Sequence, residues 1–351
     1  MRMLFTGGGT LGSVIPLVVL YEELRAEGKM ISSDALWIGG KKGPERDAVE
    51  RAGIQFRSII TGKIRRYAHW RNGIDLVLIV VGFFQAMWHV LRFRPSVIVN
   101  AGSYIGFPVV MAGWMLRVRC VIIQLDVDPV RTNLLTAPFA DSVCVAFPES
   151  VRFFPAKKTL VTGIPVRPTA YSLISVRPDE KHLPLVYIIG GSTGSQALNT
   201  LVAQTVASLS HVARIIHITG KQKGGENSAL KLRYPNYEPY EFVGDETLLY
   251  TARADIVVSR AGAGMIAELS ALKKPSILIP LPSSPQVHNA AYVQERGGAL
   301  VLSEETCTPE LFVHTITRLL SDSAQRSKLS EHIARLFPAD SAKRIAKLIT
   351  H

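Results

Sequence analysis

Three glycine-rich loops hold the residues whose types and spacing could bind a phosphate. Their sequences are GGGTLG at residues 7–12, GGSTG at 190–194 and RAGAG at 260–264, and each follows a short apolar run. Backbone N–H groups in such a loop bind anions, and the dipole of a following helix strengthens the binding. The three loops together indicate a site for a nucleotide diphosphate, but they do not name a reaction.

Two side chains add chemistry to these loops. Ser192 lies inside the second loop, where its hydroxyl can join the backbone donors. Glu268 follows the third loop by one helical turn, and a carboxylate there is well placed to accept a pair of ribose hydroxyls. The alternatives are simpler: loop 7–12 is only a tight turn between a strand and a helix, and Glu268 is a first-turn acid that complements the helix dipole.

The first loop matches two better-known phosphate loops poorly. Gly7, Gly9 and Gly12 have the GxGxxG spacing of dinucleotide-binding proteins, but no acidic residue ends the second apolar strand, ALWIGGKK. A Walker loop requires Lys-Ser or Lys-Thr after its glycines, and neither follows here. An NAD-dependent oxidoreductase is therefore disfavoured.

Short apolar runs alternate with helical patterns along the chain, which indicates parallel sheets covered on both faces. We expect strands within residues 1–8, 35–40, 95–100, 121–125 and 142–146, then within 183–191, 214–220, 240–244, 254–260 and 275–282, with helices over 14–27 and 196–209. The pattern starts twice, so we expect two doubly wound domains. Their predicted bounds are 1–165 and 166–337, with prolines marking the linker and a C-terminal helix at 338–351 packing back on the first domain.

Composition limits the class of protein. Of 351 residues, 47% are hydrophobic and 19% are charged, which is typical of an ordered globular chain. The net charge of +12 indicates an anionic partner. Three cysteines without a CxxC pair exclude a disulfide scaffold and a zinc ribbon and fit a reducing cytosol. Glycines interrupt the first apolar run, so we expect no signal peptide.

A basic and aromatic segment suggests contact with a membrane surface. Its apolar centre, LVLIVVGFF at residues 76–84, is shorter than the roughly 20 residues of a membrane span, and Asp75, Gln85 and His89 interrupt it. The flanks are rich in basic and aromatic side chains: Arg57, Lys63, Arg65, Arg66, Trp70, Arg71, Phe83, Phe84, Trp88, Arg92 and Arg94. Such a helix can lie on an anionic leaflet. A buried core helix is the alternative; no motif supports nucleic acid.

Motifs in order along the whole chain resemble those of the MurG family, bacterial transferases that move N-acetylglucosamine from UDP to lipid I to make lipid II. The segments are GGGTLGSVIP (7–16), AGSYIGFP (101–108), LDVDPVRTN (125–133), VTGIPVR (161–167), GGSTGSQALN (190–199), YEFVGD (240–245), SRAGAGMIAEL (259–269), LPSSPQVHNAAYV (281–293) and a closing PADSAKRIAKLI. The chain is identified as a divergent member of that family.

The resemblance implies a fold, an activity and partners. The fold is the GT-B glycosyltransferase fold, two Rossmann-like domains with the active site in the cleft between them. The activity is hexosyl transfer from UDP-N-acetylglucosamine to a polyprenyl-diphosphate lipid acceptor in peptidoglycan synthesis, and hence in cell wall biogenesis, cell shape and cell division. No cofactor and no essential metal are implied. The enzyme would work as a peripheral protein on the cytoplasmic face of the plasma membrane and would bind no nucleic acid.

The resemblance also assigns residues by position. The donor would contact Arg167, Gly191, Ser192, Phe242, Val243, Ala263, Gly264, Met265, Glu268, His288 and Asn289, with Phe242 and Val243 beside the uracil and Glu268 on the ribose. The lipid-linked diphosphate would face Thr10, Leu11, Gly12, Tyr104, Asn133 and Asn199. The membrane would contact Arg65, Arg66, Trp70, Arg71, Phe83, Phe84 and Trp88.

Several of these positions depart from the family pattern: Leu11, Ser13, Gln124, Asp126, Met265, Asn289 and Tyr292. Ser13 replaces the family's histidine, and an unperturbed hydroxyl cannot take a proton near neutral pH. Asp126 replaces an asparagine in the acceptor segment, so Asp126, with Ser13, is the catalytic candidate. Three alternatives stay open: a MurG with a relocated base, a paralogue that uses another UDP-sugar or acceptor, and an inactive nucleotide-sugar-binding protein.

Overall fold

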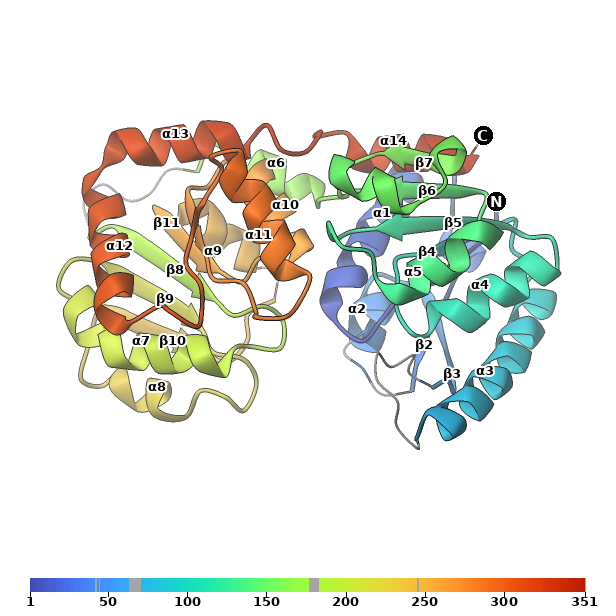
Figure 1. Cartoon of the computed structure of the whole chain (residues 1–351), viewed down its shortest axis with the longest axis horizontal. Helices are drawn as coiled ribbons and strands as arrows, with labels where there is room; N and C mark the ends of the chain where they lie inside the picture. Colours follow the sequence, from blue (N-terminus) through green and yellow to red (C-terminus); the bar gives the residue numbers. More distant parts are fainter. Residues whose placement is uncertain (42, 44, 63–70, 177–182, 245, 351) are drawn as a thin grey trace. The chain divides into compact units, whose positions relative to one another are not determined.

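The computed structural model describes every residue except 42, 44, 63–70, 177–182, 245 and 351. The chain divides into two compact units (Figure 1). The first unit is Met1–Pro165 together with Asp340–His351, and the second is Val166–Ala339.

A sheet of seven parallel strands forms the centre of the first unit, in the order β3-β2-β1-β4-β5-β6-β7. The strands are β1 Met3–Thr6, β2 Ala35–Gly40, β3 Gln55–Ile59, β4 Val97–Asn100, β5 Arg119–Gln124, β6 Ser142–Val145 and β7 Thr159–Val161. The α-helices are α1 Ile15–Ala26, α2 Glu45–Arg51, α3 Arg71–Phe93, α4 Gly106–Met115, α5 Arg131–Thr136 and α14 Ser341–Thr350.

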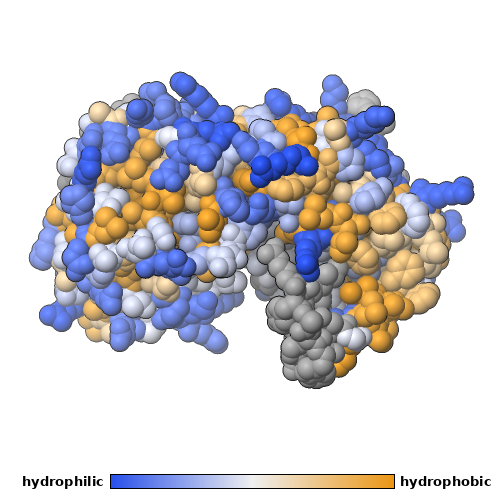
Figure 2. Space-filling view, in the orientation of Figure 1, coloured by the Kyte–Doolittle hydropathy of each residue, from blue (hydrophilic) through white to orange (hydrophobic). Residues whose placement is uncertain are grey.

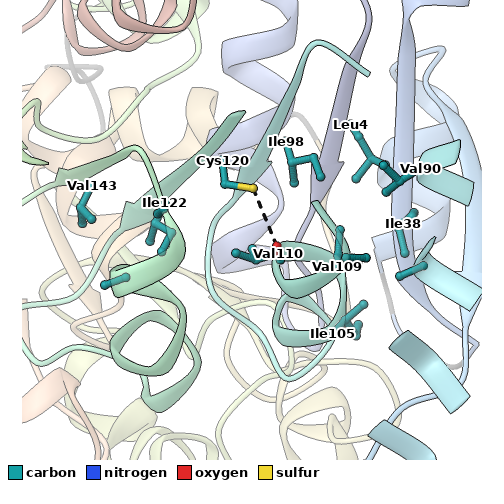
Figure 3. Packing of buried hydrophobic residues seen from close by; sticks show 14 of the residues in the cluster. Leu4, Ile38, Val90, Ile98, Ile105, Val109, Val110, Cys120, Ile122 and Val143 are labelled. Atoms are coloured by element: carbon teal, nitrogen blue, oxygen red, sulfur yellow. Dashed lines mark hydrogen bonds between the residues drawn. The ribbon is translucent and has the colours of Figure 1, made fainter. Parts of the chain in front are cut away.

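Both faces of this sheet are buried at the strands β1, β2 and β4, and side chains alternate between the two faces along each strand. Leu4 and Ile98 belong to a cluster that packs against Val109 and Val110 of α4 (Figure 3). Phe5, the next residue of β1 after Leu4, lies on the opposite face of the sheet and packs edge-on against Tyr21 of α1. The continuous apolar strands predicted from the sequence therefore lie between two layers of helices.

The C-terminal helix α14 is tied to the first unit by Arg119. The guanidinium donates to the backbone oxygens of Leu348, at 2.8 Å, and Ile349, at 3.3 Å. A cation at the last carbonyls of a helix complements the helix dipole. Ile345 and Ile349 are buried, and α14 packs against α1. The first unit is therefore completed by a helix from the C-terminal end of the chain.

The second unit repeats the arrangement with six parallel strands in the order β10-β9-β8-β11-β12-β13. They are β8 Leu185–Ile189, β9 Arg214–Ile218, β10 Tyr237–Tyr240, β11 Ile256–Ser259, β12 Ser276–Leu278 and β13 Leu300–Val301. The α-helices are α6 Pro168–Ser172, α7 Gln196–Leu209, α8 Gly225–Leu230, α9 Glu246–Arg253, α10 Ala263–Ala271, α11 Gln286–Glu295, α12 Pro309–Ser321 and α13 Ser323–Ile333. Two doubly wound units confirm the predicted GT-B fold class.

The strand predicted at 240–244 is wrong. The observed strand β10 ends at Tyr240, and residues 241–244 form the loop after it. The strand includes Pro239, which lacks an N–H donor but is tolerated because β10 is at the edge of the sheet. The apolar pair Phe242 and Val243 suggested a strand, but it belongs to a loop at the carboxyl edge.

Helix α3 buries one face and exposes the other. Ala86 and Val90 pack into the core of the first unit. The exposed α3 face consists of apolar side chains between 39 and 63% exposed, namely Ile74, Leu76, Val77, Val80, Val81, Phe84, Trp88 and Leu91. Trp114 and Met115 at the end of α4 are also exposed. Figure 2 shows apolar side chains gathered over α3 and α4.

Among the described residues, one helix is long and apolar enough to cross a membrane by length and composition alone. It is Gly73–Phe93 within α3. An 18-residue stretch of this helix has a mean hydropathy of 1.9, and 17% of that stretch is buried. The prediction that this segment is too short to span is wrong on length, because Asp75, Gln85 and His89 lie within the helix without ending it. Length therefore does not decide between a helix that crosses a membrane and one that lies on it.

Candidate functional site

The loop after β8 in the second unit leaves part of its backbone open. A Cβ on Gly190 would lie 2.6 Å from the Ser195 nitrogen, and one on Gly194 would lie 2.3 Å from the Thr219 oxygen. These two glycines are required by close packing. Gly191 has φ +88° and nothing within 4 Å of an added Cβ, and Ser192 beside it is exposed. The open backbone at 191–192 is suited to an incoming anion.

The loop after β11 is open in the same way. Added Cβ atoms on Gly262 and Gly264 would meet nothing within 4 Å. Gly262 precedes α10, and its side-chain-free position leaves the first N–H groups of the helix without a capping side chain. Strands β8 and β11 are hydrogen-bonded neighbours, so the two open loops emerge side by side at the same edge of the sheet.

Arg260 holds these two loops together, a role that the sequence analysis missed. Its guanidinium is buried and donates to Ser195 Oγ at 2.5 Å and to the Ile279 oxygen at 3.0 Å. It also forms an ion pair with Glu304. The position of Arg260 inside a glycine loop could have indicated this role, because a buried arginine is almost always paired.

Glu268 and Arg167 form an ion pair in the second unit. Arg167 Nη2 lies 3.3 Å from Glu268 Oε1, and the glutamate side chain is 15% exposed. Burial raises the pKa of Glu268, and the Arg167 charge opposes that rise. Glu268 lies beyond the first turn of α10, so the interpretation as a first-turn acid is wrong. A largely desolvated carboxylate beside a guanidinium is suited to a ribose next to a phosphate.

The remaining predicted donor residues divide into exposed and buried ones. Phe242 is 43% exposed, with Lys221 Nζ 5.1 Å from its ring centroid, and His288 is exposed on α11. Val243 is buried. Asn289 is fully buried and donates to the Ala261 oxygen at 3.1 Å. Its amide therefore supports the third glycine loop from beneath, and a direct contact with a sugar stays a prediction.

Asn199 also lies in the second unit and is fully buried. Its amide donates to the Thr219 and Lys223 oxygens, both at 3.0 Å. Its backbone oxygen accepts from Asn227, whose Oδ1 accepts from Tyr237 Oη at 2.8 Å, and Tyr237 lies 2.8 Å from His217 Nδ1. This buried chain fixes the loop after β9. Contact of Asn199 with an acceptor diphosphate stays a prediction.

The first glycine loop, after β1, is occupied by a carboxylate of the chain itself. Glu45 at the start of α2 is fully buried. Its Oε1 accepts from the Gly40 N–H at 3.1 Å, and its Oε2 accepts from the Gly9 N–H at 3.4 Å. A Cβ on Gly8 would lie 2.6 Å from Oε1. No acidic residue ends β2; Glu45 lies five residues after the end of β2, at the start of α2.

Residues 10–13 complete that loop at the surface. Thr10 and Gly12 are exposed, while Leu11 and Ser13 are half-buried. Ser13 Oγ donates over 3.4 Å to the Gly8 and Thr10 oxygens. The serine hydroxyl is therefore directed back at its own loop, and nothing in these contacts activates it as a base.

A buried amide network lies at the carboxyl ends of β4 and β5. Asn100 Nδ2 donates to Asn133 Oδ1 at 3.1 Å, and Asn133 Nδ2 donates to Gln124 Oε1 at 2.8 Å. Gln124 in turn donates to the Asp126 backbone oxygen at 2.8 Å. Asn133 is fully buried, so it shapes the loops that carry Tyr104 and Asp126, both half-buried. A direct acceptor contact of Asn133 stays a prediction.

The predicted membrane residues fall into four groups. Arg65, Arg66 and Trp70 lie outside the described residues, and Arg71 is the first residue of α3. Phe84 and Trp88 belong to the exposed α3 face. Phe83 instead packs against the core of the first unit, because it follows the buried Gly82 on the inner side of the helix.

No cluster of three or more His, Cys, Asp or Glu side chains suited to a metal ion exists among the described residues. The chemistry offered by the second unit is anion and hydroxyl recognition through open backbone, Arg167 and Glu268. The first unit offers carboxylates and a phenol at the edge of its sheet. Such groups can hold a nucleoside diphosphate and move a proton.

Comparisons with known proteins place both units in one family. The chain matches the N-terminal domain of glycosyltransferase family 28 over residues 3–145 and the C-terminal domain over residues 185–345. A Clostridium kluyveri protein named UDP-N-acetylglucosamine–N-acetylmuramyl-(pentapeptide) pyrophosphoryl-undecaprenol N-acetylglucosamine transferase is 35% identical over 328 residues, 91% of each chain. The protein of the same name from Lachnoclostridium phytofermentans is 32% identical over 330 residues, 92% of this chain and 91% of that one.

Solved structures show the same fold at lower identity. The chain is similar to Acinetobacter baumannii MurG with a TM-score of 0.77 and 23% identity, covering 100% of this chain and 99% of that one. It is also similar to the glycotransferase of kitacinnamycin with a TM-score of 0.73 and 18% identity, covering 99% and 98%.

Proposed function

The chain belongs to the MurG family of glycosyltransferases, and we propose that it moves N-acetylglucosamine from UDP-N-acetylglucosamine to an undecaprenyl-diphosphate-linked N-acetylmuramoyl peptide. The relative from Clostridium kluyveri carries the name of that transferase and aligns over 91% of both chains. In the reaction an acceptor hydroxyl oxygen bonds to C1 of the sugar, the bond to UDP breaks, and the hydroxyl proton leaves. The product, lipid II, is a precursor of peptidoglycan.

The observation that carries the donor half of this proposal is the open backbone of the second unit. Gly191, Gly262 and Gly264 leave space on neighbouring loops, and the Arg167–Glu268 pair supplies one cation and one carboxylate. We assign the diphosphate to the loop N–H groups and Arg167, and the ribose hydroxyls to Glu268. Binding of UDP would then replace the ion pair with two charge-assisted contacts to the ligand.

For the acceptor half, we place the lipid-linked diphosphate and sugar at the carboxyl edge of the first sheet, near Tyr104 and Asp126. Asp126 follows β5, and its backbone is fixed by Gln124 and Ser150. An ionised carboxylate at this edge can accept the hydroxyl proton, whereas Ser13 is directed at its own loop. We therefore assign the base to Asp126.

One observation supports a second candidate, a paralogue with a different donor sugar. Asn289 and Met265 replace family residues of the sugar-reading and donor loops, and Asn289 is turned into the protein toward Ala261. The nucleotide contacts assigned above use loop N–H groups, Arg167 and Glu268, and the side chains of Met265 and Asn289 are not among them. A change of sugar would therefore leave UDP recognition intact.

A transfer assay tests the function and separates these candidates. The full chain is incubated with a short-chain polyprenyl-diphosphate N-acetylmuramoyl-pentapeptide and, in parallel, UDP-N-acetylglucosamine, UDP-N-acetylgalactosamine or UDP-glucose. We expect transfer from UDP-N-acetylglucosamine at the highest rate. Preferred transfer from another donor would establish the paralogue, and UDP binding without transfer from any donor would establish an inactive binding protein.

We also propose that the enzyme is peripheral and lies with the exposed α3 face on the cytoplasmic leaflet. A helix that crossed the membrane would have to withdraw Ala86 and Val90 from the core and break the 2.8 Å hydrogen bond from the Ile60 N–H to Gln85. Lying on the surface keeps both and buries only the exposed residues. The chain's positive charge would add attraction to anionic lipids.

Vesicle binding tests this placement. Phe84→Glu with Trp88→Glu should release the protein from vesicles of anionic phospholipid, and reversing Arg65, Arg66 and Arg71 to Glu should do the same. Leu232→Glu, which changes a 93% exposed leucine of the second unit, is the matched control and should stay bound. Retention of all variants on the vesicles after a carbonate wash would support a spanning helix instead.

A further inference from the structure

Glu45 is the feature of the first unit that the proposed function does not use. It is a fully buried acid, and a buried charge is expensive unless it is hydrogen-bonded. Both of its oxygens accept backbone N–H groups, from Gly40 and from Gly9. Gly40 is the last residue of β2 and Gly9 follows β1, so the carboxylate joins the carboxyl ends of neighbouring strands.

The glycines around Glu45 leave the space that its carboxylate fills. Added Cβ atoms on Gly8 and Gly43 would lie 2.6 and 2.0 Å from its carboxylate oxygens, and one on Gly40 would lie 3.3 Å away. Contacts under 3.0 Å force a side chain or the backbone to shift. Glycines from two loops are thus shaped around one carboxylate, rather than around a space left for a phosphate.

Tyr104 lies next to this carboxylate. The Cβ position of Gly40 is 3.3 Å from Tyr104 Oη as well as from Glu45 Oε1. The pKa of Tyr104 is raised, first by burial and then by the Glu45 charge. A phenol that keeps its proton can donate a hydrogen bond to an anionic or hydroxyl-bearing acceptor.

We infer that Glu45 is a positioning residue of the acceptor half: it fixes the loop after β1 to the end of β2 and sets that loop beside Tyr104. This inference rests on the proposed acceptor site in the first unit. Glu45 does not touch the acceptor, because it has no exposed surface. It acts through the loop backbone at Gly8 and Gly9, whose outer residues Thr10 and Gly12 are exposed.

The test compares Glu45→Gln with Asp47→Asn. Both variants remove one negative charge from the same helix, α2, but Asp47 is exposed whereas Glu45 is fully buried. Glutamine keeps the shape of glutamate and offers one oxygen, so its NH2 group faces a backbone N–H. We expect the acceptor kcat/KM of Glu45→Gln to fall by about tenfold to a hundredfold, since a small displacement of a binding loop has effects of this size. The KM for UDP-N-acetylglucosamine should stay unchanged in both variants.

Three further measurements separate positioning from simple stability. UDP titration calorimetry reports whether the second unit is intact, and thermal unfolding reports whether each variant is folded at the assay temperature. Glu45→Asp keeps the charge but draws it back, so it should give a smaller loss and decides the question where Glu45→Gln does not fold. The alkaline limb of the acceptor kcat/KM should move to lower pH in Glu45→Gln, because removing the negative charge lowers the pKa of Tyr104, and should vanish in Tyr104→Phe.

The outcomes distinguish this inference from the proposed function. Absence of transfer by the unmodified chain would contradict the function itself. Transfer with folded Glu45 variants that retain the acceptor kcat/KM would overturn the positioning role. A loss confined to the KM of the UDP-sugar would instead contradict the placement of the acceptor in the first unit.

Discussion

The two units present glycine loops that look alike in sequence and differ in what fills them. In the first unit, the space beside Gly8 and Gly40 is taken by Glu45. In the second unit, the space beside Gly191, Gly262 and Gly264 is open. A strand followed by glycines therefore predicts close approach of some group to the backbone, but it does not tell whether that group is the chain's own or a ligand's.

The units also differ in how they support their loops. The first unit uses a network of side-chain amides, Asn100, Asn133 and Gln124. The second unit uses a chain that ends in a histidine, His217, whose pKa is lowered to about 3 by burial. The difference predicts distinct responses of the two units to substitution, ligand and pH.

The largest expected effect is on turnover and belongs to the first unit. Asp126→Asn should lower kcat by about a hundredfold or more, because general-base catalysis is typically worth 10²–10⁴-fold. The affinity for UDP should stay unchanged, since Asp126 is not in the donor unit. The comparison needs single-turnover rates for Asp126→Asn, Ser13→Ala and Ser13→His. Full activity of Asp126→Asn would rule out the relocated base.

The next effect is on donor affinity and belongs to the second unit. Glu268→Ala should weaken UDP binding by at least about tenfold, because hydrogen bonds to a charged group are worth about 1.5–3 kcal/mol. Burial raises the pKa of Glu268, so the carboxylate takes up a proton at a higher pH than an ordinary glutamate. UDP affinity should therefore fall on acidification before exposed carboxylates titrate, and Glu268→Gln should abolish that dependence. Calorimetry at several pH values measures both, with exposed Glu305→Gln as the control.

A matched pair of alanine substitutions tests the contrast between filled and open loops directly. Gly8→Ala should destabilise the first unit by about 1–3 kcal/mol, because its Cβ overlaps the Glu45 carboxylate. Gly264→Ala should not destabilise the second unit and can add about 0.5–1 kcal/mol, since alanine favours the helix α10. The same Gly264→Ala should weaken UDP binding. Equal thermal shifts for the two variants, with UDP binding unaffected, would remove the distinction.

The smallest effect is on acid stability. His217 binds a proton only near pH 3 when folded, whereas an unfolded histidine does so near pH 6.5. Between these values the unfolded state binds more protons, so stability is lost as the pH falls through that window. His217→Gln should flatten the decline of the melting temperature between pH 7 and 4. Exposed His211→Gln should not, and an identical slope in both variants would mean that His217 does not contribute.

Much of the fold followed from local patterns. The strands near Met3, Val97, Val121 and Ser142 were predictable because a parallel strand buried on both faces is apolar throughout. The strand at 240–244 was misplaced because Phe242 and Val243 are apolar but lie in the loop after β10, at the carboxyl edge of the sheet. The edge strands β3 and β7 were not predicted, because β3 mixes polar and apolar residues and β7 is only three residues long.

The sequence by itself determined the family and the GT-B fold class and indicated the activity, because ordered motifs and strand–glycine–helix units can each be recognised in a short stretch of residues. The tertiary structure alone decided which polar groups are available. Asn133, Asn199 and Asn289 are buried and hold loops, and Glu45 fills the first glycine loop from 36 residues away. Exposure and pairing depend on which strands become neighbours, and that is settled only when distant segments pack together and their polar groups must find partners out of water.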